Sequence, residues 1–118
     1  MSTDDDSRTE QARNLGRLVL RSERDGDTHI LELLGELDIA GAPALDEELE
    51  RVEATDALSI VVDLRGLEFI DSTGLRLLVM AADRCRDNGR LALLRGPDPV
   101  HRVFELTDLV SRLPFSDL

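Results

Sequence analysis

The amino-acid sequence predicts a single α/β domain built on a mostly parallel sheet. After an initial pair of strands, strand-like and helix-like segments alternate along the chain, which is the pattern of right-handed crossover units. The segment 59–64, Ser-Ile-Val-Val-Asp-Leu, is short, apolar and rich in β-branched residues, as is typical of a central strand covered on both faces. A length of 118 residues suits one hydrophobic core and is too short for two.

The first two strands form a predicted hairpin. Apolar residues recur in the segments 18–24 and 28–34, and the Asp-Gly-Asp tripeptide at 25–27 is a typical turn between them. We expect this hairpin to be the one antiparallel edge pair of the sheet. The segment 35–38, Gly-Glu-Leu-Asp, is expected to break the second strand ahead of the first helix.

Three helices are predicted, each from apolar residues that recur every three or four positions. Pro43 starts the first, the segment 71–74 opens the second and Asp98 precedes the third. Strands at 90–94 and 113–115 complete the order strand, strand, helix, strand, helix, strand, helix, strand. The apolar positions are Leu45, Leu49 and Val52 in the first helix, Leu75, Leu78, Val79 and Ala82 in the second, and Val100, Val103, Phe104 and Leu106 in the third.

The amino-terminal segment has the composition of a tail. Residues 1–13 are polar, acidic and without apolar periodicity, so we expect a disordered tail ahead of a domain that spans 14–118. The tail lacks the apolar stretch of a signal peptide, and no apolar run approaches the roughly 20 residues of a membrane-spanning helix. We therefore expect a cytoplasmic protein without a membrane partner.

Charge and composition narrow the partners further. A net charge of −11 argues against binding to nucleic acid, because phosphate-binding surfaces need clustered cations, so the expected partners are proteins. Cys85 is the only cysteine, which excludes an internal disulfide and, with only two histidines, argues against a metal site. We interpret Cys85 as a core residue, and His29 and His101 as solvated surface residues.

The segment 69–75, Phe-Ile-Asp-Ser-Thr-Gly-Leu, is the strongest candidate for a functional site. It places Ser72 and Thr73 between a buried strand and the start of a helix. Two interpretations remain open: a residue here only caps the helix, or Ser72 accepts a phosphate whose charge the helix start tolerates. A nucleophilic enzyme is disfavoured because the sequence has neither a G-x-S-x-G elbow nor a glycine-rich phosphate loop.

Asp38 is the second candidate residue. Loops at the carboxyl ends of parallel strands meet at one edge of a sheet, so we expect Asp38 to lie close to Asp71 and Ser72. Carboxylates gathered there would form an acidic binding surface.

Together, the segments 35–38, 61–64 and 69–75 resemble the STAS domain, and within that family the anti-sigma factor antagonists. The resemblance extends from about Leu18 to Phe115. It implies a non-catalytic protein without a cofactor. The unmodified form would bind an anti-sigma factor that is itself a serine kinase and so release a sigma factor. Phosphorylation would end this binding, and a PP2C-type phosphatase would restore it.

By motif position, Ser72 is the implied phosphorylation site, and Asp38, Asp71, Ser72, Thr73 and Gly74 are the implied partner-binding residues. Gly74 would keep the helix start open. Thr73 stands where the family usually has a second serine, so its hydroxyl is a further possible acceptor.

Relatives often continue into a helix beyond the last strand, which leaves open how one face of the sheet is covered here. The alternative function is a STAS subunit of a transport complex or stressosome-like assembly without the phosphorylation switch. In either case, we expect a monomer or weak dimer.

Overall fold

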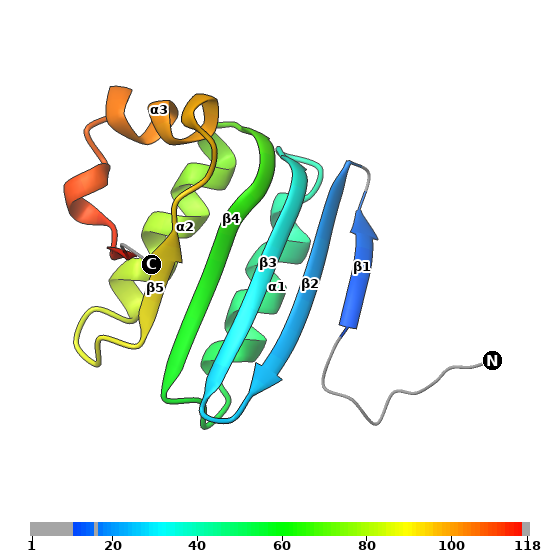
Figure 1. The fold of residues 1–118 in the computed structure, drawn as a ribbon, viewed down its shortest axis with the longest axis vertical. Helices are drawn as coiled ribbons and strands as arrows, with labels where there is room; N and C mark the ends of the chain where they lie inside the picture. The colour runs from blue at the N-terminus through cyan, green and yellow to red at the C-terminus, as the bar shows by residue number, and fades with distance from the viewer. Residues whose placement is uncertain (1–10, 16, 117–118) are drawn as a thin grey trace.

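The computed structural model describes residues 11–15 and 17–116 (Figure 1). Six strands lie in one sheet in chain order: β1 Gln11–Leu15, β2 Leu18–Asp25, β3 Thr28–Leu37, β4 Ser59–Ile70, β5 Leu91–Leu94 and β6 Phe115–Ser116. The helices are α1 Ala42–Glu53, α2 Ser72–Arg84 and α3 Asp98–Leu106, followed by a short 3-10 helix, η2, at Val110–Arg112. The predicted α/β fold is confirmed, including the order of strands and helices from β2 onward.

The strand pairing is mostly as predicted. β2 and β3 form the antiparallel hairpin, and β3, β4, β5 and β6 are parallel to one another. The difference is β1, which pairs antiparallel with β2 and takes the edge of the sheet. This strand includes residues 11–13 of the predicted tail, because pairing through backbone amides needs no apolar pattern in the sequence. The rest of that tail, residues 1–10, lies outside the described residues.

The prediction that the segment 35–38 breaks the second strand was wrong. β3 continues to Leu37, and its register against β4 shifts between Gly35 and Glu36. Gly35 has a φ of +92°, and a Cβ there would lie 2.1 Å from the carbonyl oxygen of Arg17. Glycine therefore lets the strand bulge and continue, which places Asp38 at the strand's carboxyl end.

Most of the core lies between the sheet and two helices on one of its faces, and α3 contributes the buried Val100 and Phe104. Figure 1 shows α1 and α2 behind the sheet and α3 beside the upper end of β4. In the part of the chain that the structure describes, no helix lies in front of β2, β3 and β4. β4 is therefore not covered on both faces as predicted, and Val61 is only half-buried. The fully buried core residues include Leu20, Leu31, Leu33, Leu45, Leu49, Ile60, Val62, Leu78 and Phe104.

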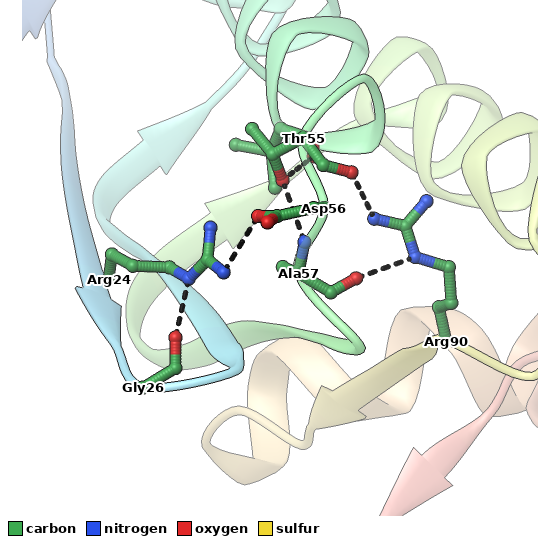
Figure 2. A network of polar contacts seen from close by, with 7 residues as sticks. Arg24, Gly26, Thr55, Asp56, Ala57 and Arg90 are labelled. Carbon is green, nitrogen blue, oxygen red and sulfur yellow. Dashed lines mark hydrogen bonds and ion pairs between the residues drawn. The ribbon is translucent and has the colours of Figure 1, made fainter.

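Arginine side chains hold together the loops at the amino ends of the parallel strands (Figure 2). Arg90, just before β5, donates to three carbonyl oxygens of the segment 53–57 at 3.0 to 3.2 Å. Arg24, at the end of β2, donates to Asp56 at 2.9 Å. These contacts connect the loop between α1 and β4 to its neighbours. The loops at the opposite end of the sheet carry the candidate site.

Candidate functional site

The parallel pairing of β3 and β4 brings Asp38 and Asp71 together. Leu37 lies opposite Ile70 in the register, and each aspartate directly follows one of these residues. The amide of Asp71 donates to the carbonyl oxygen of Leu37 at 3.1 Å. The structure thus joins the two segments that were singled out as candidates from the sequence.

Asp71 is the N-cap of α2. Its backbone is extended, and its Oδ1 accepts hydrogen bonds from the amides of Thr73 at 3.0 Å and Gly74 at 3.1 Å. Its carbonyl oxygen accepts the first helical bond, from Leu75, at 3.0 Å. One carboxylate therefore satisfies two of the amides that a helix start leaves without partners.

Ser72 is the first residue of α2 and is exposed. No other described residue forms a hydrogen bond with its hydroxyl, whereas Thr73 beside it is half-buried. The capping interpretation therefore applies to Asp71 and not to Ser72. The Ser72 hydroxyl is free to react without loss of a contact within the described part of the chain.

Gly74 is buried and does not face solvent. A Cβ at this position would lie 2.6 Å from Cγ of Leu37 and 3.1 Å from Cγ1 of Ile70. The resemblance implied that Gly74 keeps the helix start open, and these contacts show what a larger side chain would meet there. Glycine is needed here because α2 packs directly on the ends of β3 and β4, so its effect on any partner is indirect.

Two large exposed apolar residues lie within two positions of the aspartates in the sequence. Ile39 follows Asp38 and is 72% exposed, and Phe69 precedes Ile70 and is 47% exposed. Asp38 holds the Ile39 turn in place, because its Oδ1 accepts from the amide of Ala40 at 3.1 Å. We call the group formed by Asp38, Ile39, Phe69, Asp71 and Ser72 the Ser72 surface. It combines exposed apolar area with carboxylates, as protein-binding surfaces do.

Both histidines were expected at the surface, and this prediction was wrong. Each is only 5% exposed. His29 lies on the face of β3 that α1 and α2 cover, and His101 packs against the rings of Phe104 and Phe115. The prediction for Cys85 is confirmed, because it lies in the hydrophobic core, where burial raises the pKa of its thiol and opposes thiolate formation.

A serine, a histidine and a carboxylate meet inside the core. The Ser22 hydroxyl lies 2.6 Å from Nε2 of His29, and Glu48 contacts Ser22 and forms an ion pair with Arg51. Burial lowers the pKa of His29, whereas the hydrogen bond from Arg51 lowers the pKa of Glu48. In a catalytic triad the carboxylate orients the histidine. Here the carboxylate contacts the serine, and Nδ1 of His29 has no partner among the described residues.

Sequence reasoning did not name Ile39 or Phe69 as partner-binding residues, although Phe69 opens the candidate segment 69–75. An apolar residue type alone does not show whether a side chain is buried or exposed. The one available signal was position, since Ile39 directly follows Asp38 and Phe69 lies two residues before Asp71.

Comparisons with known proteins agree with this geometry. The family model described as "Mlab, STAS domain" matches residues 20–113. An anti-sigma-B factor antagonist of Listeria monocytogenes is 34% identical over 88 residues, which cover 74% of this chain and 77% of that protein. One of Staphylococcus aureus is 36% identical over 76 residues, which cover 64% of this chain and 70% of that protein.

A solved structure shows the same fold. The crystal structure of an anti-sigma factor antagonist from Mycobacterium paratuberculosis matches with a TM-score of 0.77 at 24% identity, and the match covers 86% of each chain. The chain belongs to the STAS domain family, as its motifs predicted, and the relatives named above are anti-sigma factor antagonists. None of the helices within 17–116 is long and apolar enough to span a bilayer.

Proposed function

We propose that this protein is an anti-sigma factor antagonist controlled by phosphorylation of Ser72. The unphosphorylated form binds an anti-sigma factor that is a serine kinase, and this binding releases a sigma factor. Phosphorylation of Ser72 by the kinase ends the binding. The names of the relatives support the antagonist role, and the geometry around Ser72 supports the switch.

The proposal rests on the different roles of Asp71 and Ser72 at the start of α2. Asp71 alone caps α2, while the exposed Ser72 hydroxyl contributes no hydrogen bond to the described part of the fold. A kinase therefore gains access to a serine whose modification leaves the fold intact. If Ser72 were the helix cap, its side-chain oxygen would instead accept a hydrogen bond from an amide of the first turn.

The same surface explains how a phosphate would end binding. Ile39 and Phe69 supply apolar area for a partner to bury, and Asp38 and Asp71 lie beside Ser72. A phosphoserine carries about two negative charges at neutral pH. Pressing these charges against a partner adds desolvation and repulsion from the adjoining carboxylates, whereas in the free protein water solvates them.

The remaining parts of the proposal follow from this cycle. The chain acts by binding and is not an enzyme, and it needs no cofactor, because ATP belongs to the kinase. A PP2C-type phosphatase removes the phosphate. We propose that the cycle takes place in the cytoplasm and that the antagonist acts as a monomer or weak dimer, with Thr73 and Gly74 supporting the site from within.

The test uses an anti-sigma factor kinase from the same genome with Mg-ATP, and mass spectrometry to locate the phosphate. We expect the phosphate on Ser72, no phosphate on Ser72→Ala, and unchanged labelling of Thr73→Ala. Ser72→Ala should bind the kinase as wild type does, and Ser72→Glu about a hundredfold more weakly, which corresponds to about 2.8 kcal/mol. Equal affinities for all three proteins would overturn the switch and favour a STAS subunit without one.

A further inference from the structure

A phosphate on Ser72 would find two of the amide donors that a helix start ordinarily offers to an anion already taken. Asp71 Oδ1 already accepts from the amides of Thr73 and Gly74, at 3.0 and 3.1 Å. The carboxylate of Asp71 is also a negative charge next to the phosphate. A phosphoserine here needs a different partner for its charge.

Arg76 is in position to be that partner. It lies four residues after Ser72 on α2, and both residues are exposed. Side chains four residues apart on a helix are neighbours, with Cβ atoms about 5–6 Å apart. An anion that precedes a cation by four residues is also the more favourable order along a helix.

Arg76 has no competing partner in the described part of the chain. The other arginines on helices α1 and α2 are engaged: Arg51 pairs with Glu48, Arg84 with Glu53, and Arg86, just beyond α2, with Asp83. No carboxylate within 17–116 lies within 4.0 Å of the Arg76 guanidinium. Its charge is therefore available when Ser72 is modified.

We infer that Arg76 binds the phosphate of phosphorylated Ser72 through an ion pair across one turn of α2. This inference rests on the proposed phosphorylation of Ser72. The planar guanidinium offers two parallel N–H donors to two phosphate oxygens, a geometry that a lysine ammonium does not match. The pair holds the phosphate dianion on the outer face of α2. Phosphorylation then changes the surface twice, because it adds an anion and also engages a cation that was free.

The experiment places phosphoserine at position 72 by site-specific incorporation during translation, so no kinase is required. A titration followed by phosphorus NMR gives the midpoint for loss of the second phosphate proton. Arg76 favours the dianion, so Arg76→Gln should move the midpoint to higher pH by a few tenths of a unit. Arg76→Lys, which keeps the charge but not the paired donors, should lie between the two.

Arg112→Gln is the matched control. Arg112 is an exposed arginine on η2 and lines the same cavity as Arg86, which follows the carboxyl end of α2. Its removal subtracts the same charge far from the Ser72 turn. Its midpoint should equal that of the wild type. An unchanged midpoint in Arg76→Gln, or an equal shift in Arg112→Gln, would overturn the inference.

Failure of the proposed function would be seen in the affinity for the kinase and not in the NMR titration. In that case the kinase would bind the phosphoserine protein as tightly as the unmodified one, whatever the NMR midpoints were.

Discussion

The side chain of Leu37, at the end of β3, lies directly beneath Gly74 in the first turn of α2. A Cβ on Gly74 would lie 2.6 Å from Cγ and 2.8 Å from Cδ2 of Leu37. The carbonyl oxygen of Leu37 meanwhile accepts from the amide of Asp71 at 3.1 Å. Leu37 therefore contacts the start of α2 in two ways: its side chain packs under the first turn, and its carbonyl oxygen binds the amide of the N-cap residue.

Gly74→Ala should lower the free energy of unfolding by about 1–3 kcal/mol, because the added methyl group must displace Leu37 or the helix. Alanine favours a helix over glycine by up to about 1 kcal/mol, so a loss of stability isolates the clash. Urea denaturation measures the change. Leu37→Ala leaves a cavity that can hold the methyl group added by Gly74→Ala. The double variant should therefore lose less stability than the sum of the losses in the two single variants. Strict additivity, or a stable Gly74→Ala protein, would show that the contact is relaxed in solution.

Asp71 and Ser72 should differ sharply in their effect on stability. Asp71→Ala removes the only side-chain cap of α2 and should cost about 1 kcal/mol, whereas Asp71→Asn keeps an acceptor oxygen and should cost much less. Ser72→Ala should change the free energy of unfolding by less than about 0.5 kcal/mol, since its hydroxyl makes no contact with described residues. Thermal denaturation compares the three variants. A Ser72→Ala protein as destabilised as Asp71→Ala would return the capping role to Ser72.

His29 should make the fold weaker in mild acid. Burial is the main cause that lowers its pKa below 6.5, the nearby Arg51 and Arg24 lower it further, and Glu48 opposes them. The unfolded chain therefore binds this proton more readily, and the free energy of unfolding falls as the pH drops below 6.5. The contribution of Glu48, whose pKa is lowered from 4.5, is lost only at still lower pH.

Urea denaturation between about pH 7.5 and about pH 5.5 should show this loss in the wild type. His29→Gln keeps a polar partner for Ser22 but does not titrate in this range, so its stability should fall less over the same interval. Parallel pH profiles for the two proteins would assign the effect to other groups.

Much of the fold was predictable because its main signals are local. The β-branched run in β4 and the apolar spacing of α1 and α2 each follow from the side chains of one segment. β1 and the bulge at Gly35 were missed because they depend on partners: β1 on the free edge of β2, and Gly35 on the backbone of Arg17. A single sequence contains no local mark of either contact.

The candidate site was predictable to the same degree. Topology alone placed Asp38 beside Asp71 and Ser72, since the carboxyl ends of neighbouring parallel strands share an edge. It did not decide which residue caps α2, because Asp, Ser and Thr are all good caps and the choice depends on the backbone angles at Asp71. Nor did it identify Gly74 as a packing residue, which requires knowing that Leu37 lies below it.

The exposed apolar residues of the Ser72 surface should contribute directly to partner binding. Ile39 and Phe69 are 72% and 47% exposed in the free protein, so both present apolar area that a partner can bury. Ile39→Ala and Phe69→Ala should each weaken binding to the anti-sigma factor kinase about tenfold, as expected when an apolar side chain near an interface centre is truncated. Isothermal titration calorimetry measures the affinity, and thermal denaturation confirms that each variant is folded.

Leu58→Ala provides the matched control for this measurement. Leu58 is 70% exposed, as accessible as Ile39, but it directly precedes β4 at the opposite end of the sheet. Its truncation removes a similar apolar area and should leave the affinity unchanged. If all three variants bound equally weakly, general loss of apolar surface would explain the effect. If Ile39→Ala and Phe69→Ala bound as tightly as the wild type, the partner would contact a different face, and a charge on Ser72 would have to act on it from a distance.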